Sequence, residues 1–253
     1  MKRCYFYFVA ISTLLFAIRE GMAEEIVGGV VKYQEITRYN FKTTGKPRWD
    51  NFIATLPSSG KKAKVLYFTK EKALYEDDAV ELEAPNKGLQ KVLVVMSKGK
   101  PPNSALEKVY YDFEKDEMIR QVTFMTRGFR IVGAKEKKAW KLTNKMTKVQ
   151  GYTCMSAELQ VGDDTFNAWF TPEIPISAGP DLFFGLPGLI LVVEKNGETV
   201  FMATSVEMAP PDEDALSQPG QGKKVTQKKF DEIMEEKVKE FEETVAKKKK
   251  GKR

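Results

Sequence analysis

The chain has 253 residues, of which 41 are Lys or Arg, 35 are Asp or Glu and none is His, and its formal net charge is +6. Most of this charge lies at the carboxyl end: residues 223–253 hold twelve basic and seven acidic residues, whereas residues 24–222 hold twenty-six and twenty-seven. A near-neutral body argues against a nucleic-acid-binding face. Without histidine, Ser-His-Asp and Cys-His catalysis are excluded and the commonest transition-metal ligand is missing. We therefore expect no enzyme, no cofactor and no metal site.

The first 23 residues have the pattern of a signal peptide. A basic start, Met1-Lys2-Arg3, precedes an apolar run over residues 4–18, and small residues stand at positions 21 and 23. The run is shorter than the roughly 20 apolar residues that span a bilayer. We expect cleavage after Ala23, a periplasmic or secreted protein, and no transmembrane segment after leader removal. A retained amino-terminal anchor is the alternative.

Residues 24–209 are predicted to form one antiparallel β domain. Short runs of β-branched and aromatic residues alternate with turn residues, and Asn196-Gly197 is the strongest hairpin signal. Closely spaced strands with short turns favour an antiparallel sheet over β-α-β crossovers. The predicted fold class is mainly β, with nine or ten strands in a strongly curved antiparallel sheet (half-barrel or sandwich-like). Residues 49–54 are predicted as one helical turn, and residues 77–102 as a mobile excursion.

The carboxyl end is predicted to contain a polar linker (210–224), an amphipathic α-helix (225–246) and a basic disordered tail (247–253). Apolar residues recur in the helix at spacings of three and four, as expected for one apolar face. Thr226 is placed as the N-cap, with Val225 and Phe230 as a hydrophobic staple. The polar linker favours a helix that projects or docks loosely, and the basic tail is either solvated or in contact with an anionic surface. The apolar face of the predicted helix consists of Phe230, Ile233, Met234, Val238, Phe241 and Val245.

The most distinctive stretch is residues 168–191, where four of the twelve prolines stand among large apolar side chains. Pro and Gly normally mark polar, exposed turns. An apolar loop of this kind would be costly to leave in water. We predict that it packs against the β core and ends in a buried strand over residues 189–193.

Residues 185–190 read Gly-Leu-Pro-Gly-Leu-Ile, and matching positions precede them from Trp140 onward. In their order and spacing these positions resemble the signature of the GLPGLI family, a group of exported bacterial proteins typical of Bacteroidetes. The resemblance implies a location in the cell envelope, a mostly β fold and a structural role for the motif, and it implies no activity. The motif positions are Trp140, Gly151, Tyr152, Cys154, Trp169, Phe170, Pro172, Glu173, Pro175, Gly179, Pro180, Gly185, Leu186, Pro187, Gly188, Leu189 and Ile190.

Five side chains in or near the motif have both a structural and a functional interpretation. Cys154 is interpreted as a small buried residue, with a reactive or partner-bonding thiol as the alternative. Glu173 and Asp181 are expected to accept backbone N–H groups of the loop, rather than to form a two-carboxylate centre. Trp140 and Trp169 are expected to anchor the core, rather than to form a platform for a sugar.

The sequence is compatible with two classes of function. The first is a non-enzymatic binding or carrier module, in which an apolar concave face of the sheet holds a hydrophobic or lipid-like ligand, as in lipoprotein-carrier half-barrels. The second is an interaction or accessory protein for an outer-membrane or surface assembly, which would use a sheet edge or the helix. A hydrophobic ligand or an envelope protein is therefore the expected partner.

Overall fold

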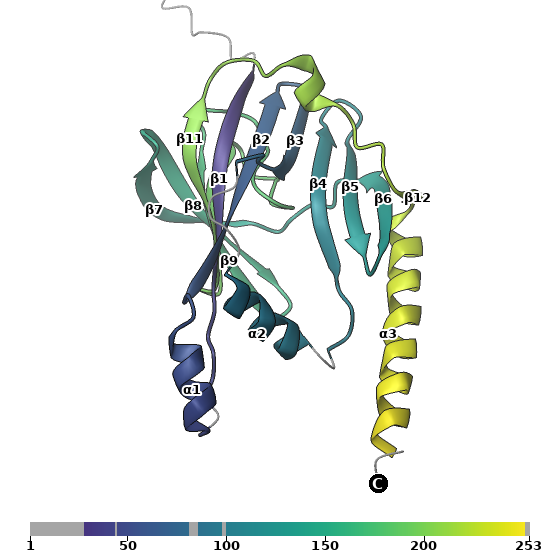
Figure 1. Ribbon diagram of the computed structural model, residues 1–253. Helices are drawn as coiled ribbons and strands as arrows, with labels where there is room; N and C mark the ends of the chain where they lie inside the picture. The colour runs from purple at the N-terminus through teal and green to yellow at the C-terminus, as the bar shows by residue number, and fades with distance from the viewer. Residues whose placement is uncertain (1–27, 44, 81–85, 98–99, 251–253) are drawn as a thin grey trace, which may run out of the picture.

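The computed structural model describes residues 28–43, 45–80, 86–97 and 100–250 (Figure 1). The predicted signal peptide, residues 1–23, lies outside these ranges, as does the end of the basic tail. Across the described ranges, no helix is both long enough and apolar enough to cross a membrane.

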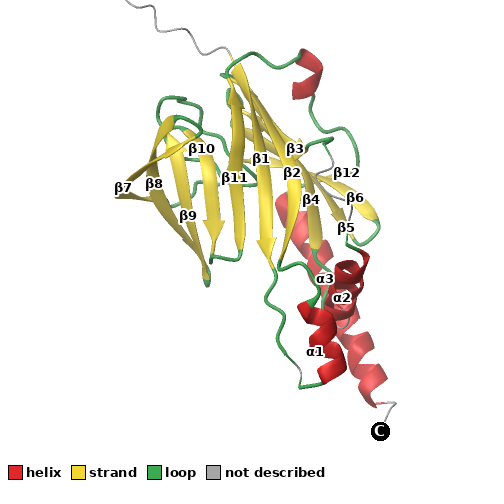
Figure 2. Cartoon of the chain, turned by 60° about the vertical axis from the view of Figure 1, so that its left-hand side comes forward, coloured by secondary structure: helices red, strands yellow, loops and turns green. Residues whose placement is uncertain are grey.

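One open twelve-stranded sheet forms the body of the molecule (Figure 2). Its order is β12-β6-β5-β4-β3-β2-β1-β11-β10-β9-β8-β7, so the first strand lies at the centre beside the last long one. The predicted class, a curved sheet with a carboxyl-terminal helix, is confirmed. Two details differ: the described strands number twelve, and the short β12 pairs with β6 in parallel, so the sheet is mixed. The strands are β1 (Gly28–Arg38), β2 (Ser59–Thr69), β3 (Lys72–Asp77), β4 (Ser104–Asp112), β5 (Glu117–Phe124), β6 (Arg127–Ala134), β7 (Lys141–Val149), β8 (Tyr152–Val161), β9 (Asp164–Thr171), β10 (Leu189–Lys195), β11 (Thr199–Glu207) and β12 (Lys223–Val225).

The strongest predicted hairpin is present. Asn196, Gly197 and Glu198 join β10 to β11; the first two have left-handed φ angles of 49° and 70°, and the Glu198 N–H donates to the Lys195 carbonyl oxygen at 2.8 Å. Lys195 faces Thr199 across this turn. The register of the β10–β11 pair is therefore fixed locally by the Asn-Gly sequence.

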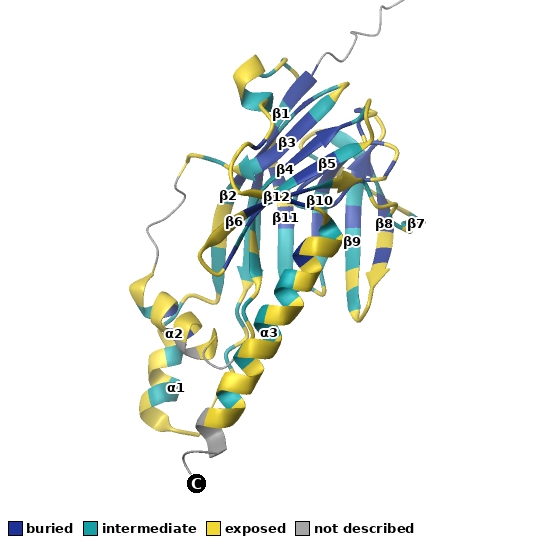
Figure 3. Ribbon diagram, turned by 90° about the vertical axis from the view of Figure 1, so that its right-hand side faces the viewer, coloured by how far each residue is buried: buried dark blue, intermediate teal, exposed yellow. Residues whose placement is uncertain are grey.

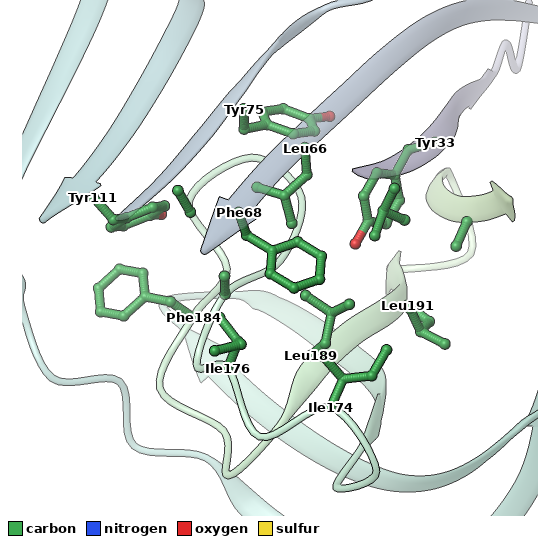
Figure 4. Packing of buried hydrophobic residues seen from close by; sticks show 14 of the residues in the cluster. Tyr33, Leu66, Phe68, Tyr75, Tyr111, Ile174, Ile176, Phe184, Leu189 and Leu191 are labelled. Atoms are coloured by element: carbon green, nitrogen blue, oxygen red, sulfur yellow. The ribbon is translucent and has the colours of Figure 1, made fainter. Parts of the chain in front are cut away.

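The main core lies between two parts of the folded-over sheet, with the loop of residues 172–188 inserted between them (Figure 4). Tyr33, Leu66 and Phe68 from β1 and β2 face Ile174 of the loop and Leu189 of β10. Ile174 and Leu189 are no more than 1% exposed. The inner side of the sheet, the expected place of a ligand, is thus packed with the protein's own loop.

Two short helices project from the end of the sheet where β2 begins. α1 (Pro47–Ala54) contains the predicted helical turn and starts on a proline, which suits the first helical position. α2 (Lys87–Ser97) lies inside residues 77–102, the predicted mobile excursion, for which we predicted no helix. Asn86 starts α2 by accepting the Leu89 N–H on its Oδ1 at 2.8 Å.

The carboxyl-terminal helix α3 (Gln227–Lys250) is attached firmly at its start and projects beyond it (Figure 3). Thr226 accepts the Lys229 N–H on its Oγ1 at 3.3 Å, as expected of the N-cap. Val225 and Phe230 are 7% and 4% exposed and pack in one cluster with Phe129 of β6. Because these first turns belong to a core cluster, removing the chain after Gly222 is expected to destabilise the fold.

The segment expected to be a polar linker contains two regular elements. A single 3-10 turn, η1, covers Glu213–Leu216, and Leu216 packs against the small cluster of Leu74, Tyr110 and Ile119. β12 then pairs residues 223–225 with residues 129–131 of β6. The backbone of this segment thus follows the sheet and leads α3 to its docking position.

Candidate functional site

The chain between β6 and β7 passes from near one edge of the sheet to the other edge (Figure 1). We call residues 135–140 the crossing segment. The Trp140 Nε1–H donates a hydrogen bond to the Phe184 carbonyl oxygen at 2.8 Å. Lys138 Nζ lies 5.3 Å from the centre of the Phe184 ring. The crossing segment therefore lies directly on the loop of residues 172–188.

A cavity of about 340 Å³ lies where β5, β6, the crossing segment, the loop and the start of α3 meet. This volume is within the usual range for small-molecule sites, about 300–1,000 Å³. Its lining combines apolar and charged side chains from five separate parts of the chain. The apolar lining residues are Met118, Ile131, Val132, Leu182 and Phe184, and the charged ones are Arg120, Glu136, Lys138 and Asp231.

Arg120 is the most constrained charged group of this cavity. It points to the same side of β5 as Met118 and Val122, which are both buried. Its guanidinium donates to the Oε1 atom of Gln227 at the start of α3, and its Nε is buried with no hydrogen-bond partner among the described residues. Burial is the main reason that its pKa lies below the usual arginine value. A partly desolvated cation with a free donor favours an anionic partner.

Lys138 supplies a second cation from the crossing segment. Its Nζ lies over the rings of Phe184 and Phe183, at 5.3 and 6.0 Å from their centres. Burial lowers the pKa of Lys138, and Asp181 and Glu136 only partly oppose that shift. This ammonium group is therefore held against an apolar wall.

The two acidic lining residues, Glu136 and Asp231, are exposed. Across the described chain, neither Arg120 nor Lys138 forms an ion pair within 4.0 Å. The cavity therefore places two cations beside an apolar wall, and the carboxylates near them act on their pKa values from beyond ion-pair distance. That combination suits a ligand with one acidic group and an apolar body.

None of the predicted motif residues lines this cavity; they form the structure behind it. A side chain on Gly188 would place its Cβ 2.1 Å from the Thr171 carbonyl oxygen. One on Gly179 would lie 2.7 Å from the Ile190 Cβ atom. Both glycines let the loop pass tightly against β9 and β10, which positions Leu182 and Phe184 at the cavity.

Cys154 and the two carboxylates of the motif region occupy separate places. Cys154 is fully buried in the main core, and burial raises its pKa to about 11. Glu173 accepts the Thr153 N–H on its Oε1 at 2.8 Å. Asp181 has a φ of 52°, and burial, followed by repulsion from Glu35, raises its pKa above the usual value. Because its thiol is buried in the core, we assign Cys154 no contact with a ligand.

The two tryptophans also belong to the packing around the loop. Trp140 packs against the cluster that contains Phe183, with ring centres 6.3 Å apart. Trp169 packs against the main core. The remaining motif residues lie in β8, β9, β10 and the loop itself: Gly151 in the β7–β8 turn, Tyr152 and Phe170 in strands, Pro172, Pro175, Pro180, Gly185, Leu186 and Pro187 in the loop, and Ile190 in β10.

Two other features bear on where a ligand or ion could bind. In the part of the chain that the structure describes, no three His, Cys, Asp or Glu side chains are grouped to share a metal ion. A second hollow, of about 680 Å³, lies between the β2–β3 turn and η1 and is more open to solvent. Because the cavity beside Arg120 is the more enclosed of the two, it is the better candidate.

Arg120 and Lys138 were not predicted as site residues from the sequence. The sequence contains a signal for Arg120 but none for Lys138. Arg120 alternates in phase with Met118, Val122 and Phe124, so a charged side chain stands on an otherwise apolar face. Lys138 lies in a lysine-rich stretch, and nothing in that stretch distinguishes it from Lys135 or Lys137.

A family model described as a protein of unknown function (Porph_ging) matches residues 160–192, which cover β9, the loop and the start of β10. No curated protein matches the chain. Two crystal forms of PNGF-II, in space groups P21 and C2, have similar structures, with TM-scores of 0.53 and 15% and 16% identity. Each match covers 82% of this chain but only 33% and 32% of the PNGF-II chain. At this identity the likeness extends to the fold alone.

Proposed function

We propose that this protein is a non-enzymatic binding or carrier module for an amphiphile that has one acidic group. The acidic group would lie between Arg120 and Lys138, and the apolar body against Phe184 and Leu182. One observation carries the proposal: two partly desolvated cations, neither in an ion pair within 4.0 Å among the described residues, face an apolar wall in one cavity. A hydrophobic or lipid-like ligand would therefore lie against the Phe184 and Leu182 side chains of this cavity, and not inside the packed core of the sheet.

The proposal includes a place in the cell. The leader pattern and the Gly185–Ile190 sequence support an exported protein of the GLPGLI type, acting in the periplasm or outside the cell. The Porph_ging model matches residues 160–192, which include this Gly185–Ile190 sequence.

The alternative is an accessory protein for an outer-membrane or surface assembly. It is supported by β7, an edge strand on which Leu142 and Met146 are 56% and 65% exposed. Exposed edge strands can pair with a strand of another chain. Under this alternative, the purified protein would carry a bound partner protein rather than a bound small molecule.

Native mass spectrometry of protein purified from its own host tests the proposal. We expect an adduct with the mass of an acidic amphiphile on the wild-type protein, and its loss in Arg120→Gln. Arg130→Gln is the matched control, because Arg130 is also partly buried but donates to the Pro219 carbonyl oxygen at 3.2 Å outside the cavity lining. A ligand that is retained by Arg120→Gln, or lost equally in both variants, would contradict the proposed site.

A further inference from the structure

The helical end of the molecule carries apolar side chains that the fold does not use. α1 and α2 lie together beyond the start of β2, and the free end of α3 extends in the same direction (Figures 1 and 3). α1 and α2 touch closely: a Cβ on Gly88 would lie 3.1 Å from Leu56 Cδ2 and 3.7 Å from Phe52 Cζ. Leu89 and Val92 are 8% and 1% exposed, so one face of α2 is covered.

The carboxyl-terminal half of α2 is more open to solvent. Leu93, Val94 and Met96 of α2 are 37%, 59% and 44% exposed, and Phe52 of α1 is 39% exposed. Single exposed apolar residues are ordinary on protein surfaces. Four on two adjoining helices, three of them within four consecutive positions, form a group that we call the apolar strip; exposed apolar groups of this kind often mark an interaction site.

The charge on α1, on α2 and on the residues that flank them is almost entirely positive. Residues 40–57 and 86–100 contain seven Lys or Arg and one acidic residue, Asp50. Lys46, Arg48, Lys87 and Lys91 are exposed on or beside the two helices. α3 has eight Lys against seven Asp or Glu, but four of the lysines form its last turn, at the same end of the molecule. An apolar strip with basic flanks has the chemistry of helices that lie in the interface of an anionic membrane.

We propose that this end of the protein docks on the surface of an anionic lipid bilayer. Leu93, Val94 and Met96 enter the boundary between head groups and acyl chains, and Lys87 and Lys91 contact lipid phosphates. A second copy of the same face is disfavoured as the occupant, since the two basic rims would repel each other. This docking surface is independent of the ligand cavity, because the two share no residue.

Vesicle co-sedimentation tests this proposal with the protein purified in the form that its host produces. Vesicles of phosphatidylcholine are compared with vesicles of phosphatidylcholine and phosphatidylglycerol. We expect binding to the anionic vesicles only, weakened by added salt because the attraction is partly electrostatic. The double variant Val94→Asp/Met96→Asp and the double variant Lys87→Glu/Lys91→Glu should each reduce binding about tenfold.

Matched controls come from β7, on the other part of the molecule. Met146→Asp replaces a methionine that is 65% exposed, against 44% for Met96, and Lys145→Glu/Lys148→Glu reverses two exposed lysines of an edge strand. These variants should retain vesicle binding, as should Arg120→Gln. The thermal midpoint of each variant shows whether its fold is intact.

Four results would overturn the proposal. They are equal binding to neutral vesicles, equal loss in the β7 controls, displacement from vesicles by excess inorganic phosphate, and a wild-type dimer in sedimentation velocity that Val94→Asp/Met96→Asp dissociates. The third would indicate a free-phosphate site, and the fourth an interface between copies of the chain.

Discussion

The Tyr33 hydroxyl donates a hydrogen bond to the Ile190 carbonyl oxygen at 2.6 Å, across 157 residues of sequence and inside the core. It joins the first strand to the final residue of the Gly-Leu-Pro-Gly-Leu-Ile segment. Both residues are almost fully buried, and burial alone raises the Tyr33 pKa well above its ordinary value. The loop is therefore fixed to the centre of the sheet by a polar contact as well as by packing.

Tyr33→Phe tests that contact. It leaves the Ile190 carbonyl without this donor in a buried place, and we expect a loss of about 1–3 kcal/mol in unfolding free energy, measured by urea denaturation. Tyr75→Phe is the control, because the Tyr75 hydroxyl is buried without a partner in the described structure and its ring lies 6.2 Å from that of Tyr33. This second variant should be neutral or stabilising. Equal losses in both would show that the hydrogen bond itself contributes nothing.

Gly188→Ala tests the tight passage of the loop along β9. The new Cβ would collide with the backbone of Thr171, which cannot move without disturbing the β9–β10 pairing. We expect at least about 2 kcal/mol of destabilisation. Gly133→Ala has open space around its Cβ and should stay within about 0.5 kcal/mol of the wild type. A tolerated Gly188→Ala would mean that the loop is not held against the strand.

Asp181→Asn tests the burial of the loop carboxylate. The folded-state pKa of Asp181 is raised, so the folded protein binds this proton more tightly than the unfolded chain does. Stability from this group is therefore present below the unfolded pKa, about 3.9, and is lost as pH rises through the folded pKa. We expect Asp181→Asn to stabilise the protein at pH 7 and to have little effect near pH 3. Destabilisation at pH 7 would show that the ionised carboxylate has a favourable partner.

Phe230→Ala tests the docking of α3. Phe230 packs edge-on against Phe129, with ring centres 5.3 Å apart, and is almost fully buried. Its truncation should cost about 3 kcal/mol. Phe241→Ala lies on the same apolar face in the projecting half and should change stability by less than about 1 kcal/mol. If both variants cost the same, the helix is packed along its whole length.

The parts of the fold that sequence predicted are those fixed by local chemistry. Asn196-Gly197 sets one hairpin, and Thr226 with Val225 and Phe230 sets the start of α3. The order of strands was beyond sequence reasoning, because β1 pairs with β11 through contacts such as Val31 with Val206, and no local pattern encodes them.

α2 and the cavity were missed for different physical reasons. The short helix of residues 87–97 contains three β-branched residues, Val92, Val94 and Val95, which lower its intrinsic propensity, and it is held by burial of Leu89 and Val92. The cavity is built from five segments that only the folded sheet brings together. The one indication of the cavity in the sequence is Arg120, a charged residue on an otherwise apolar face of a predicted strand.

Calorimetric titration with octanoate and with octanol tests the central claim, that Arg120 and Lys138 bind an acidic amphiphile, most directly. The two probes share an apolar chain and differ in charge, so the cations should favour octanoate by about tenfold or more. Arg120→Gln and Lys138→Gln should each remove that preference, and Arg130→Gln should preserve it. Equal affinity for octanoate and octanol in the wild-type protein, or a preference that survives both cavity variants, would contradict the claim.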